Sequence, residues 1–317
     1  MKSDNKYADL NSFISFLKNT SPNGTYPGDE INYVAENIQK NADVILYASL
    51  SYDKAIQFAD NKLKSDKIFL EKVLRNNPNS IQYIDNKFVA NYDFLLNLMI
   101  GFGTDKRKNA LIFNYLPKEI KGHKEFTLKA LKINDCVASW IDEKFKNDKE
   151  IVLEMLKRGE TKVFSSYDKF KSDREVVLQA VKVDINALDS CDDKFKSDKE
   201  IVLASVKNWG ITIKHADNAL KSDREIAYEA VNQDGWAIQH LPIELQNDKE
   251  LVLKAIENNW TALKFVSEEI RIQFLKNMEV RKFIKENLNK IRNKDDTKIK
   301  QILDLIVMFE NNTNKNS

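Results

Sequence analysis

The side chains of this sequence that could do chemistry together are aromatic residues followed four positions later by lysine. Such pairs, which would share one face of an α-helix, are Phe58/Lys62, Tyr83/Lys87 and Trp140/Lys144. They suit single-stranded nucleic acid, because a base stacks on the ring while a phosphate meets the ammonium group. They also suit a protein interface, where aromatic anchors stand inside a polar rim. The third interpretation is structural: lysine stems cover apolar surface and the rings pack between neighbouring elements.

Groups that could carry catalysis are few. The chain has three histidines, His123, His215 and His240, and two cysteines, Cys136 and Cys191. Two cysteines give neither a disulfide framework nor the spacing of a metal site. The sequence also lacks a glycine-rich phosphate loop and a His-Glu-x-x-His pattern. We therefore expect a protein that is not an enzyme and that has no cofactor and no bound metal.

These residues are carried by a repeat of 25 residues. The phrase Asp-Lys/Arg-Glu, followed by apolar residues, returns at Asp148, Asp173, Asp198, Asp223 and Asp248. Self-similarity at such a period is typical of a solenoid, in which each unit buries its apolar face by stacking on its neighbours. We call each unit a rung and number its positions from this aspartate. Carried backwards, the phase predicts nine rungs that start at residues 41, 66, 91, 123, 148, 173, 198, 223 and 248, the rung at 91 being longer than the others.

Each rung begins with a signal for the start of a helix. A serine or asparagine stands three residues before a glutamate, which is the pattern of a capping box, at Asn147, Ser172, Ser197, Ser222 and Asn247. Apolar residues follow at positions 4, 5, 8 and 9, one face of a helix of about ten residues. After a break near positions 11–14, a second and shorter helix is predicted to bury positions 16, 19 and 23.

The predicted fold is all-α. It is a right-handed α-solenoid of about nine 25-residue helix–turn–helix repeats, with helical N- and C-terminal caps. In this prediction residues 1–40 form the N-terminal cap and residues 41–272 the solenoid, with an insertion near residues 101–108. Residues 273–317 form the C-terminal cap and tail, whose helices are expected at about 272–292 and 297–310.

Parts of the repeat resemble a known family. They are the Asp-Lys/Arg-Glu-Ile/Val-Val-Leu phrase, the run Ala180-Val181-Lys182, and the pairs Ala237-Ile238 and Ala262-Leu263. The family consists of bacterial and viral proteins and is described as domain of unknown function 4116. The resemblance is strongest over residues 123–270 and extends in weaker form over residues 41–122. It implies tandem helical pairs, and it carries over no catalytic residue.

In a solenoid, one rung position becomes a column of side chains along the stack. Position 18 holds aromatic or histidine side chains in most rungs, and position 22 holds lysines. We take these two columns, with one further tryptophan, as the candidate surface for a partner. Its residues are Phe58, Lys62, Tyr83, Lys87, Tyr115, Trp140, Lys144, Lys169, Lys194, Trp236 and His240.

The insertion is a second candidate, because it is where the period fails. Residues 101–108 combine two glycines with Lys106, Arg107 and Lys108, and they predict a basic, hairpin-like loop. Such a loop is either a contact site or a tolerated surface insertion.

Net charge does not identify a partner, since 50 Lys and Arg against 48 Asp and Glu leave only +2. The distribution of charge is more specific. Acids recur at positions 1 and 3, where they favour the N-termini of helices, and lysines recur at positions 10, 22 and 24 without such a local role. We therefore expect one acidic and one basic edge.

Together these patterns predict a non-catalytic helical-repeat protein that docks on a macromolecular partner, either a protein or a protein–RNA complex. The family's bacterial and viral membership suggests phage–host interaction, for example inhibition of an RNA-guided nuclease (an anti-CRISPR role). The alternatives are a stand-alone RNA-binding protein that uses the aromatic and lysine columns, and a structural scaffold. No signal peptide and no membrane-spanning apolar run is visible. We therefore expect a cytoplasmic protein with no membrane partner and no small-molecule substrate.

Overall fold

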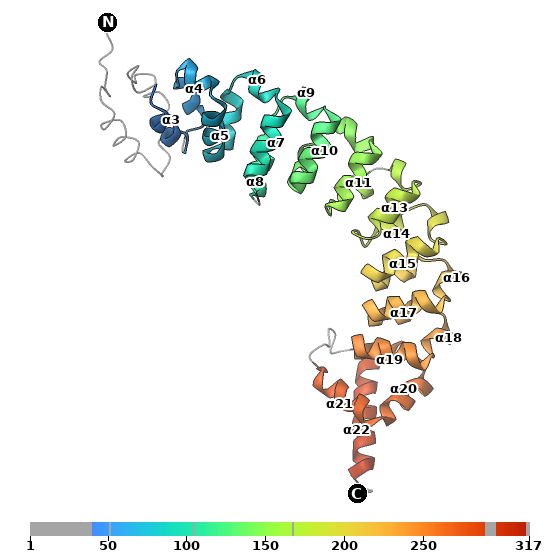
Figure 1. The fold of residues 1–317 in the computed structure, drawn as a ribbon. Coiled ribbons are helices and arrows are strands. Elements are labelled where there is room, and N and C mark those ends of the chain that lie inside the picture. Colours follow the sequence, from blue (N-terminus) through green and yellow to red (C-terminus); the bar gives the residue numbers. More distant parts are fainter. Residues whose placement is uncertain (1–39, 51, 104, 167, 289–295, 315–317) are drawn as a thin grey trace. The chain divides into compact units, whose positions relative to one another are not determined.

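A computed structural model of the chain describes residues 40–50, 52–103, 105–166, 168–288 and 296–314 (Figure 1). These residues form helices, with no strand among them, as predicted. They divide into two compact units, the N-terminal unit up to Glu160 and the C-terminal unit from Thr161. No helix in the described ranges has both the length and the apolar character needed to cross a membrane. The predicted N-terminal cap, residues 1–40, lies outside the described residues except for Lys40.

Every rung opens with an α-helix that begins one residue after position 1, so the nine predicted rung starts are confirmed. In the N-terminal unit these helices are α3 (Ala42–Ser49), α5 (Lys67–Asn76), α7 (Tyr92–Gly101), α10 (Lys124–Ile133) and α11 (Lys149–Lys157). In the C-terminal unit they are α13 (Arg174–Ala180), α15 (Lys199–Asn208), α17 (Arg224–Gln233) and α19 (Lys249–Asn258). The residues at positions 4, 5, 8 and 9, which are mostly apolar, are buried in most rungs, for example Ile201, Val202, Ser205 and Val206. The handedness of the solenoid stays a prediction.

The residue at position 1 caps each of these helices: it is an aspartate in six of the nine rungs, and Asn41, Asn91 or His123 in the others. In Asp198 the carboxylate oxygen Oδ1 accepts hydrogen bonds from the backbone N–H of Glu200 at 3.1 Å and of Ile201 at 3.3 Å. The prediction that the preceding serine or asparagine is the cap is therefore wrong. Aspartate has extended backbone at this position, reaches the first free amides directly, and brings a full negative charge to the positive end of the helix. Ser197, one residue outside the helix, instead bonds to Asp217 of the next rung.

The second half of a rung differs from the single helix that was predicted. It is usually a 3-10 helix followed by one further short turn of helix. The 3-10 helices are η2 (Asp53–Phe58), η3 (Pro78–Tyr83), η4 (Asp135–Trp140), η8 (Gly210–His215), η9 (Gly235–His240) and η10 (Trp260–Lys264). In the rungs at 148 and 173 the same place holds α12 (Lys162–Ser166) and α14 (Ala187–Ser190). Positions 16 and 19 are buried as predicted, for example Ile213 and Ala216. Position 23 is buried in some rungs, as at Phe195, but only half-buried in others, as at Leu220.

An extended residue at position 19 separates the 3-10 helix from the short turn. Ala216 has ψ 156° and Leu241 has ψ 158°, which ends the helical hydrogen bonding. A residue at position 20, such as Asp60 or Asp85, then caps the next turn. The short turns are α4 (Asn61–Ser65), α6 (Asn86–Val89), α9 (Lys118–Lys121), η5 (Glu143–Asn147), η6 (Asp168–Phe170), η7 (Asp193–Phe195), α16 (Asn218–Lys221) and α18 (Ile243–Gln246).

This geometry returns the chain to the end of the rung where it began. A ten-residue α-helix rises about 15 Å, and a six-residue 3-10 helix running back covers about 12 Å. Positions 18–25 and 1–3 therefore lie at one edge of the stack, which we call the cap edge. In Figure 1 the short helices α4, α6 and α9 of the N-terminal unit, and α16 and α18 of the C-terminal unit, lie along it.

The insertion forms a helix and not a loop. Residues Lys106–Tyr115 are α8, capped by Asp105. This helix packs against η3 on one side and η4 on the other, so it occupies the place of the 3-10 helix in its rung. The predicted basic hairpin is wrong because Asp105 caps a new helix and α8 buries Ile112 and Phe113 between the neighbouring rungs.

The described residues of the C-terminal end form three helices, α20 (Glu268–Lys276), α21 (Met278–Glu286) and α22 (Thr297–Asn314). The single helix expected at 272–292 is interrupted at Asn277, which has extended backbone and caps α21. Helix α22 extends beyond its predicted end at 310. It packs against η10 and α20, and Lys264 of η10 lies 3.0 Å from Asp296 at its start.

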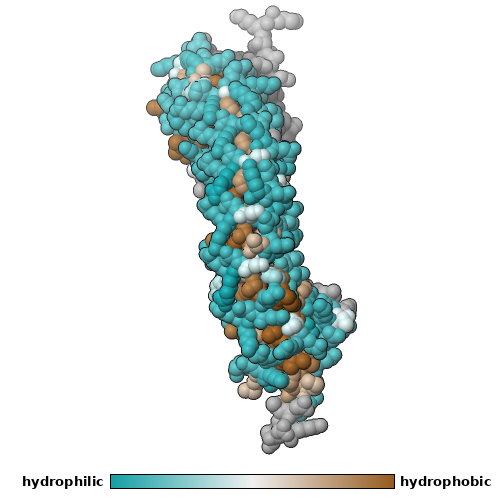
Figure 2. All heavy atoms as spheres, turned by 90° about the vertical axis from the view of Figure 1, so that its right-hand side faces the viewer, coloured by the Kyte–Doolittle hydropathy of each residue, from teal (hydrophilic) through white to brown (hydrophobic). Residues whose placement is uncertain are grey.

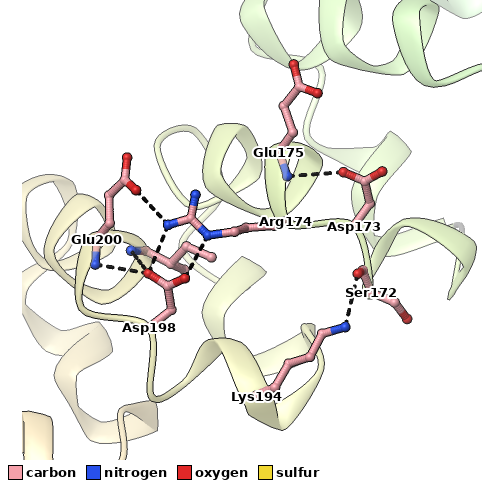
Figure 3. Close-up of polar contacts among 8 residues, drawn as sticks. Ser172, Asp173, Arg174, Glu175, Lys194, Asp198 and Glu200 are labelled. Carbon is pink, nitrogen blue, oxygen red and sulfur yellow. Dashed lines mark hydrogen bonds and ion pairs between the residues drawn. The ribbon is translucent and has the colours of Figure 1, made fainter.

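An ion-pair ladder joins successive rungs at the cap edge. The cation at position 2 of one rung contacts the acids at positions 1 and 3 of the next: Arg174 lies 2.8 Å from Asp198 and 2.6 Å from Glu200 (Figure 3). The same arrangement is formed by Lys124 with Asp148 and Glu150, by Lys199 with Asp223 and Glu225, and by Arg224 with Asp248 and Glu250. The hydrogen bonds from Arg174 lower the pKa of the Asp198 carboxyl. Each aspartate thus caps its own helix and ties it to the preceding rung.

At the opposite edge, glycine lets two rungs approach closely. A Cβ on Gly235 would stand 2.4 Å from the backbone oxygen of Ala255 in the next rung. The Gly235 N–H donates to Oδ1 of Asn258 at 2.9 Å, while the Asn258 amide donates to the Asn232 carbonyl at 3.0 Å. Gly210 and Gln233 repeat this arrangement one rung earlier.

We expect the cap to contribute more to stability than the ladder. Replacing Asp198 by Ala removes both and should lower the free energy of unfolding by about 0.5–2 kcal/mol. Asp198→Asn keeps an acceptor oxygen for the cap and should cost less, with a loss that shrinks as salt is added. Urea unfolding at low and high salt measures both variants. Equal losses in the two variants would contradict a dominant cap.

Gly235→Ala should destabilise the fold by about 1–3 kcal/mol, because the added methyl group forces the backbone of α19 away. Asn232→Ala, at an exposed position of α17, is the matched control and should change stability by less than about 0.5 kcal/mol. Thermal unfolding of the two variants tests the pair. A Gly235→Ala variant as stable as the control would show that the rungs do not need this close approach.

Candidate functional site

Where position 23 is phenylalanine, the lysine of position 22 lies over its ring, whereas Lys62 precedes Leu63 and is exposed. The ammonium of Lys144 is 5.0 Å from the Phe145 ring centroid and that of Lys194 is 4.8 Å from Phe195. Lys87 with Phe88 and Lys169 with Phe170 repeat this contact. The predicted helical pairs Phe58/Lys62, Tyr83/Lys87 and Trp140/Lys144 are therefore wrong: the extended residue at position 19 puts each aromatic residue and its lysine on different elements.

These lysines also have local partners on the cap edge. Lys194 donates to the backbone oxygen of Ser172 in the preceding rung, 3.3 Å away (Figure 3). Asp192 lies 3.9 Å from Lys194. The lysines of position 24 pair with acids of position 21, in Lys146 with Glu143, Lys171 with Asp168 and Lys196 with Asp193. The expectation of no local role is thus wrong for the lysines of positions 22 and 24.

The prediction of one acidic and one basic edge is also wrong at the cap edge. The acids of positions 1 and 3 alternate there with the cations of position 2, and the lysines of positions 22 and 24 alternate with acids. The ammonium groups of Lys87 and Lys194 still face solvent, their side chains being 56% and 60% exposed. Figure 2, which faces the right-hand side of Figure 1, shows a mostly hydrophilic surface whose apolar residues gather in its lower part.

The aromatic residues of position 18 differ in exposure. Phe58 is half-buried and stacks on Tyr52 at 6.4 Å, and half-buried Tyr83 has the Lys54 ammonium 6.0 Å from its ring. Tyr115 and Trp140 are 37% and 44% exposed. They end α8 and η4, two helices that pack on each other. We call Tyr115 and Trp140 the exposed aromatic pair.

Trp236, by contrast, is held by the next rung. Its indole N–H donates to Oγ1 of Thr261 at 2.7 Å. Its ring meets Phe265 edge-on at 6.1 Å, and the ammonium of Lys264 lies 4.7 Å from it. A tryptophan with these contacts serves rung packing, so the structure removes Trp236 from the candidate surface.

His215 and His240 lie on successive 3-10 helices and are half-buried. His215 Nδ1 is 2.8 Å from Oδ1 of Asp189, in the preceding rung. Burial lowers the pKa of both imidazoles, and Lys214 adds to the effect, while Asp189 opposes it at His215. No group of three potential metal ligands occurs in the described part of the chain.

The cations of the insertion connect rungs. Lys106 lies 2.6 Å from Asp135, which raises the lysine pKa through a hydrogen bond. Lys108 donates to the backbone oxygen of Arg75 at 3.0 Å. Arg107 is exposed on the first turn of α8. Of the three predicted contact residues, Arg107 alone points to solvent without a hydrogen bond or ion pair to another described residue.

Two grooves open between rungs of the N-terminal unit. One, of about 780 Å³, lies between the short helices α4 and α6, with Tyr83 and Lys64 in its wall. The other, of about 280 Å³, lies between the starts of α7 and α10 and is lined by Tyr92 and His123 among others. Sequence reasoning missed Tyr92. The signal was present, because Tyr92 stands at position 2, where the ladder-forming rungs carry lysine or arginine.

The histidines predict a pH dependence of stability. A folded-state pKa below the ordinary 6.5 means that the unfolded chain takes up protons first, so the free energy of unfolding should fall as the pH drops below 6.5. A His215→Gln/His240→Gln variant should show a flatter decrease, measured by urea unfolding across this range. Asp189→Asn should steepen it, because the attraction that favours the charged His215 is lost. A double variant with an unchanged slope would contradict the assignment.

The bounds of the matches to a known protein family agree with the bounds of the repeat. The family model described as Domain of unknown function (DUF4116) matches residues 41–89, 123–171, 173–221 and 223–271. Each match begins at position 1 of one rung and includes most of the next, and the rung with the inserted helix lies between two matches. No curated protein and no solved structure matches the chain. Because the matches cover more than half of its residues, the chain belongs to the family described as Domain of unknown function (DUF4116).

Proposed function

We propose that this protein is a non-catalytic binding scaffold that docks on a macromolecular partner through the cap edge of its N-terminal unit. The observation that carries the proposal is the exposed aromatic pair, Tyr115 at 37% and Trp140 at 44% exposure. Tyrosine and tryptophan are enriched among the residues that dominate binding energy at protein interfaces. They offer large, stiff surfaces, and each carries a polar group for a partner to bond.

The charges along the cap edge of each unit favour a protein over bare RNA. Phosphate binding needs a groove in which positive charge dominates. The position-22 lysines, however, stand beside acids, with Lys87 3.7 Å from Asp85 and Lys194 3.9 Å from Asp192. A surface of alternating sign suits the polar rim of a protein interface, where charges select the partner and orient it. The protein component of a protein–RNA complex would meet the same requirement.

The proposal of a more specific biological role is based on the membership of the family. Its bacterial and viral membership supports a role in phage–host interaction, with a protein or nucleoprotein of a defence system, such as an RNA-guided nuclease, as the partner. A cytoplasmic location fits Cys136 and Cys191, both of which are free thiols.

The test is affinity capture from host lysate with wild type and two tryptophan variants. Trp140→Ala should lose at least tenfold in partner recovery, the effect of a residue worth about 2 kcal/mol at an interface, while keeping its thermal stability. Trp236→Ala is the matched control: it should lower stability, because its rung contacts are lost, yet still capture the partner at a temperature where it is folded. Equal recovery by Trp140→Ala and wild type would remove the aromatic pair as the anchor.

A binding assay with labelled single-stranded RNA at two salt concentrations distinguishes a protein-binding scaffold from a stand-alone RNA-binding protein. With lysines largely neutralised by nearby acids, we expect no tight binding at low salt. Tight binding that weakens steeply as salt is added would instead support a stand-alone RNA-binding protein. Absence of both a captured partner and RNA binding would favour the structural scaffold.

A further inference from the structure

The ion-pair ladder shows which type of side chain lies at the junction between two rungs of the cap edge. At several junctions a lysine or arginine of one rung lies between the acids at positions 1 and 3 of the next, as do Lys124, Arg174, Lys199 and Arg224. In each case the cation comes from position 2. The repeat thus provides its own template for a cation seated between the starts of two long helices.

The junction between α7 and α10 lacks that cation. Position 2 is Tyr92, and position 1 of the next rung is His123, while the acid of position 3 is kept as Glu125. The Tyr92 ring lies 4.5 Å from the His123 ring and 5.3 Å from the Phe126 ring, measured between centroids. The groove of about 280 Å³ opens at this point, so its aromatic side stands where the ladder cation would be.

The polar groups of the groove leave negative charge toward solvent. Glu125 is bonded to Lys129 of its own helix at 2.7 Å, and its side chain is still 71% exposed. Asp93, in the same wall, is exposed, and Lys129 also lines the groove and interacts electrostatically with Asp93, so two carboxylates face one ammonium group there. His123 uses Nδ1 to accept the N–H of Phe126 at 3.4 Å, which turns the ring face toward Tyr92.

We propose that this groove binds an arginine side chain of the protein partner, a proposal that rests on the function proposed above. The guanidinium would lie over the Tyr92 and His123 rings and donate hydrogen bonds to the carboxylates of Glu125 and Asp93. Arginine suits the site better than lysine, because its planar group stacks on aromatic rings and bonds carboxylates through two N–H groups at once. The volume is below the range of about 300–1,000 Å³ typical of small-molecule pockets, so the groove fits one side chain.

The three histidines make the groove directly observable. In full-length protein with ¹³C-labelled histidine, Nα-acetyl-arginine amide should shift the imidazole signals of His123 in a saturable way at millimolar concentration. His215 and His240, in the other unit, are internal controls and should not respond. Nα-acetyl-citrulline amide, which has the same shape without the charge, should give no shift.

Two variants test the assignment. Glu125→Gln, at an exposed position, should weaken binding of the arginine probe about two- to fivefold, since an exposed ion pair is worth up to about 1 kcal/mol. Tyr92→Arg should abolish the response, because it supplies the ladder cation from within the chain. Should Tyr92→Arg fail to fold, Glu125→Gln still decides.

Several outcomes would overturn the proposal. They are no response of His123 to the arginine probe, an equal response of all three histidines, an equal effect of the citrulline probe, or wild-type affinity in Glu125→Gln. The result is separable from the capture experiment, since it needs no partner. Probe binding at His123 without a captured partner would leave the groove chemistry standing and reject the proposed function.

Discussion

The regular part of this structure depends on the two interactions that the aspartate at position 1 makes, a helix cap and an ion pair. Its carboxylate closes the free N–H groups at the start of its own helix and at the same time receives the cation of the preceding rung, as Asp198 does with Arg174. Short helices are marginal in isolation, and an exposed ion pair alone contributes little. Joining the cap to the ladder makes the start of one helix depend on the position of its neighbour, which suits a stack whose rungs cannot fold alone.

Because the charged side chains of the cap edge bind one another in this way, few of them remain available to a partner. Charged residues make up 31% of the chain, and at the cap edge most of the acids and cations are engaged between or within rungs. Phosphate-binding grooves need excess positive charge, so this edge is poorly suited to bare nucleic acid. For the binding proposed above, the features that the ladder does not use include the exposed rings of Tyr115 and Trp140 and the aromatic groove at Tyr92.

Two of these features, Tyr92 and Tyr115, belong to the rung where the repeat is least regular. Tyr92 replaces the ladder cation, α8 replaces a 3-10 helix, and Tyr115 ends that inserted helix. The family matches also stop at residue 89 and resume at 123. In regular rungs, polar groups form hydrogen bonds or ion pairs with neighbouring rungs, and apolar groups pack against them. A departure from the period leaves groups that neighbouring rungs do not satisfy, and a partner can use them.

The sequence by itself determined the nine rung starts and the buried face of each long helix, because caps and helical periodicity are local properties of the chain. It also located the irregular rung at 91. It could not decide that Asp198 and not Ser197 is the cap, that Arg174 serves Asp198, or that Lys144 covers Phe145 and not Trp140. These depend on contacts across rungs and on the extended residue at position 19, which breaks the helical spacing. Only the tertiary structure decided which rings stay exposed, since Trp140 and Trp236 look alike until the next rung packs against one of them.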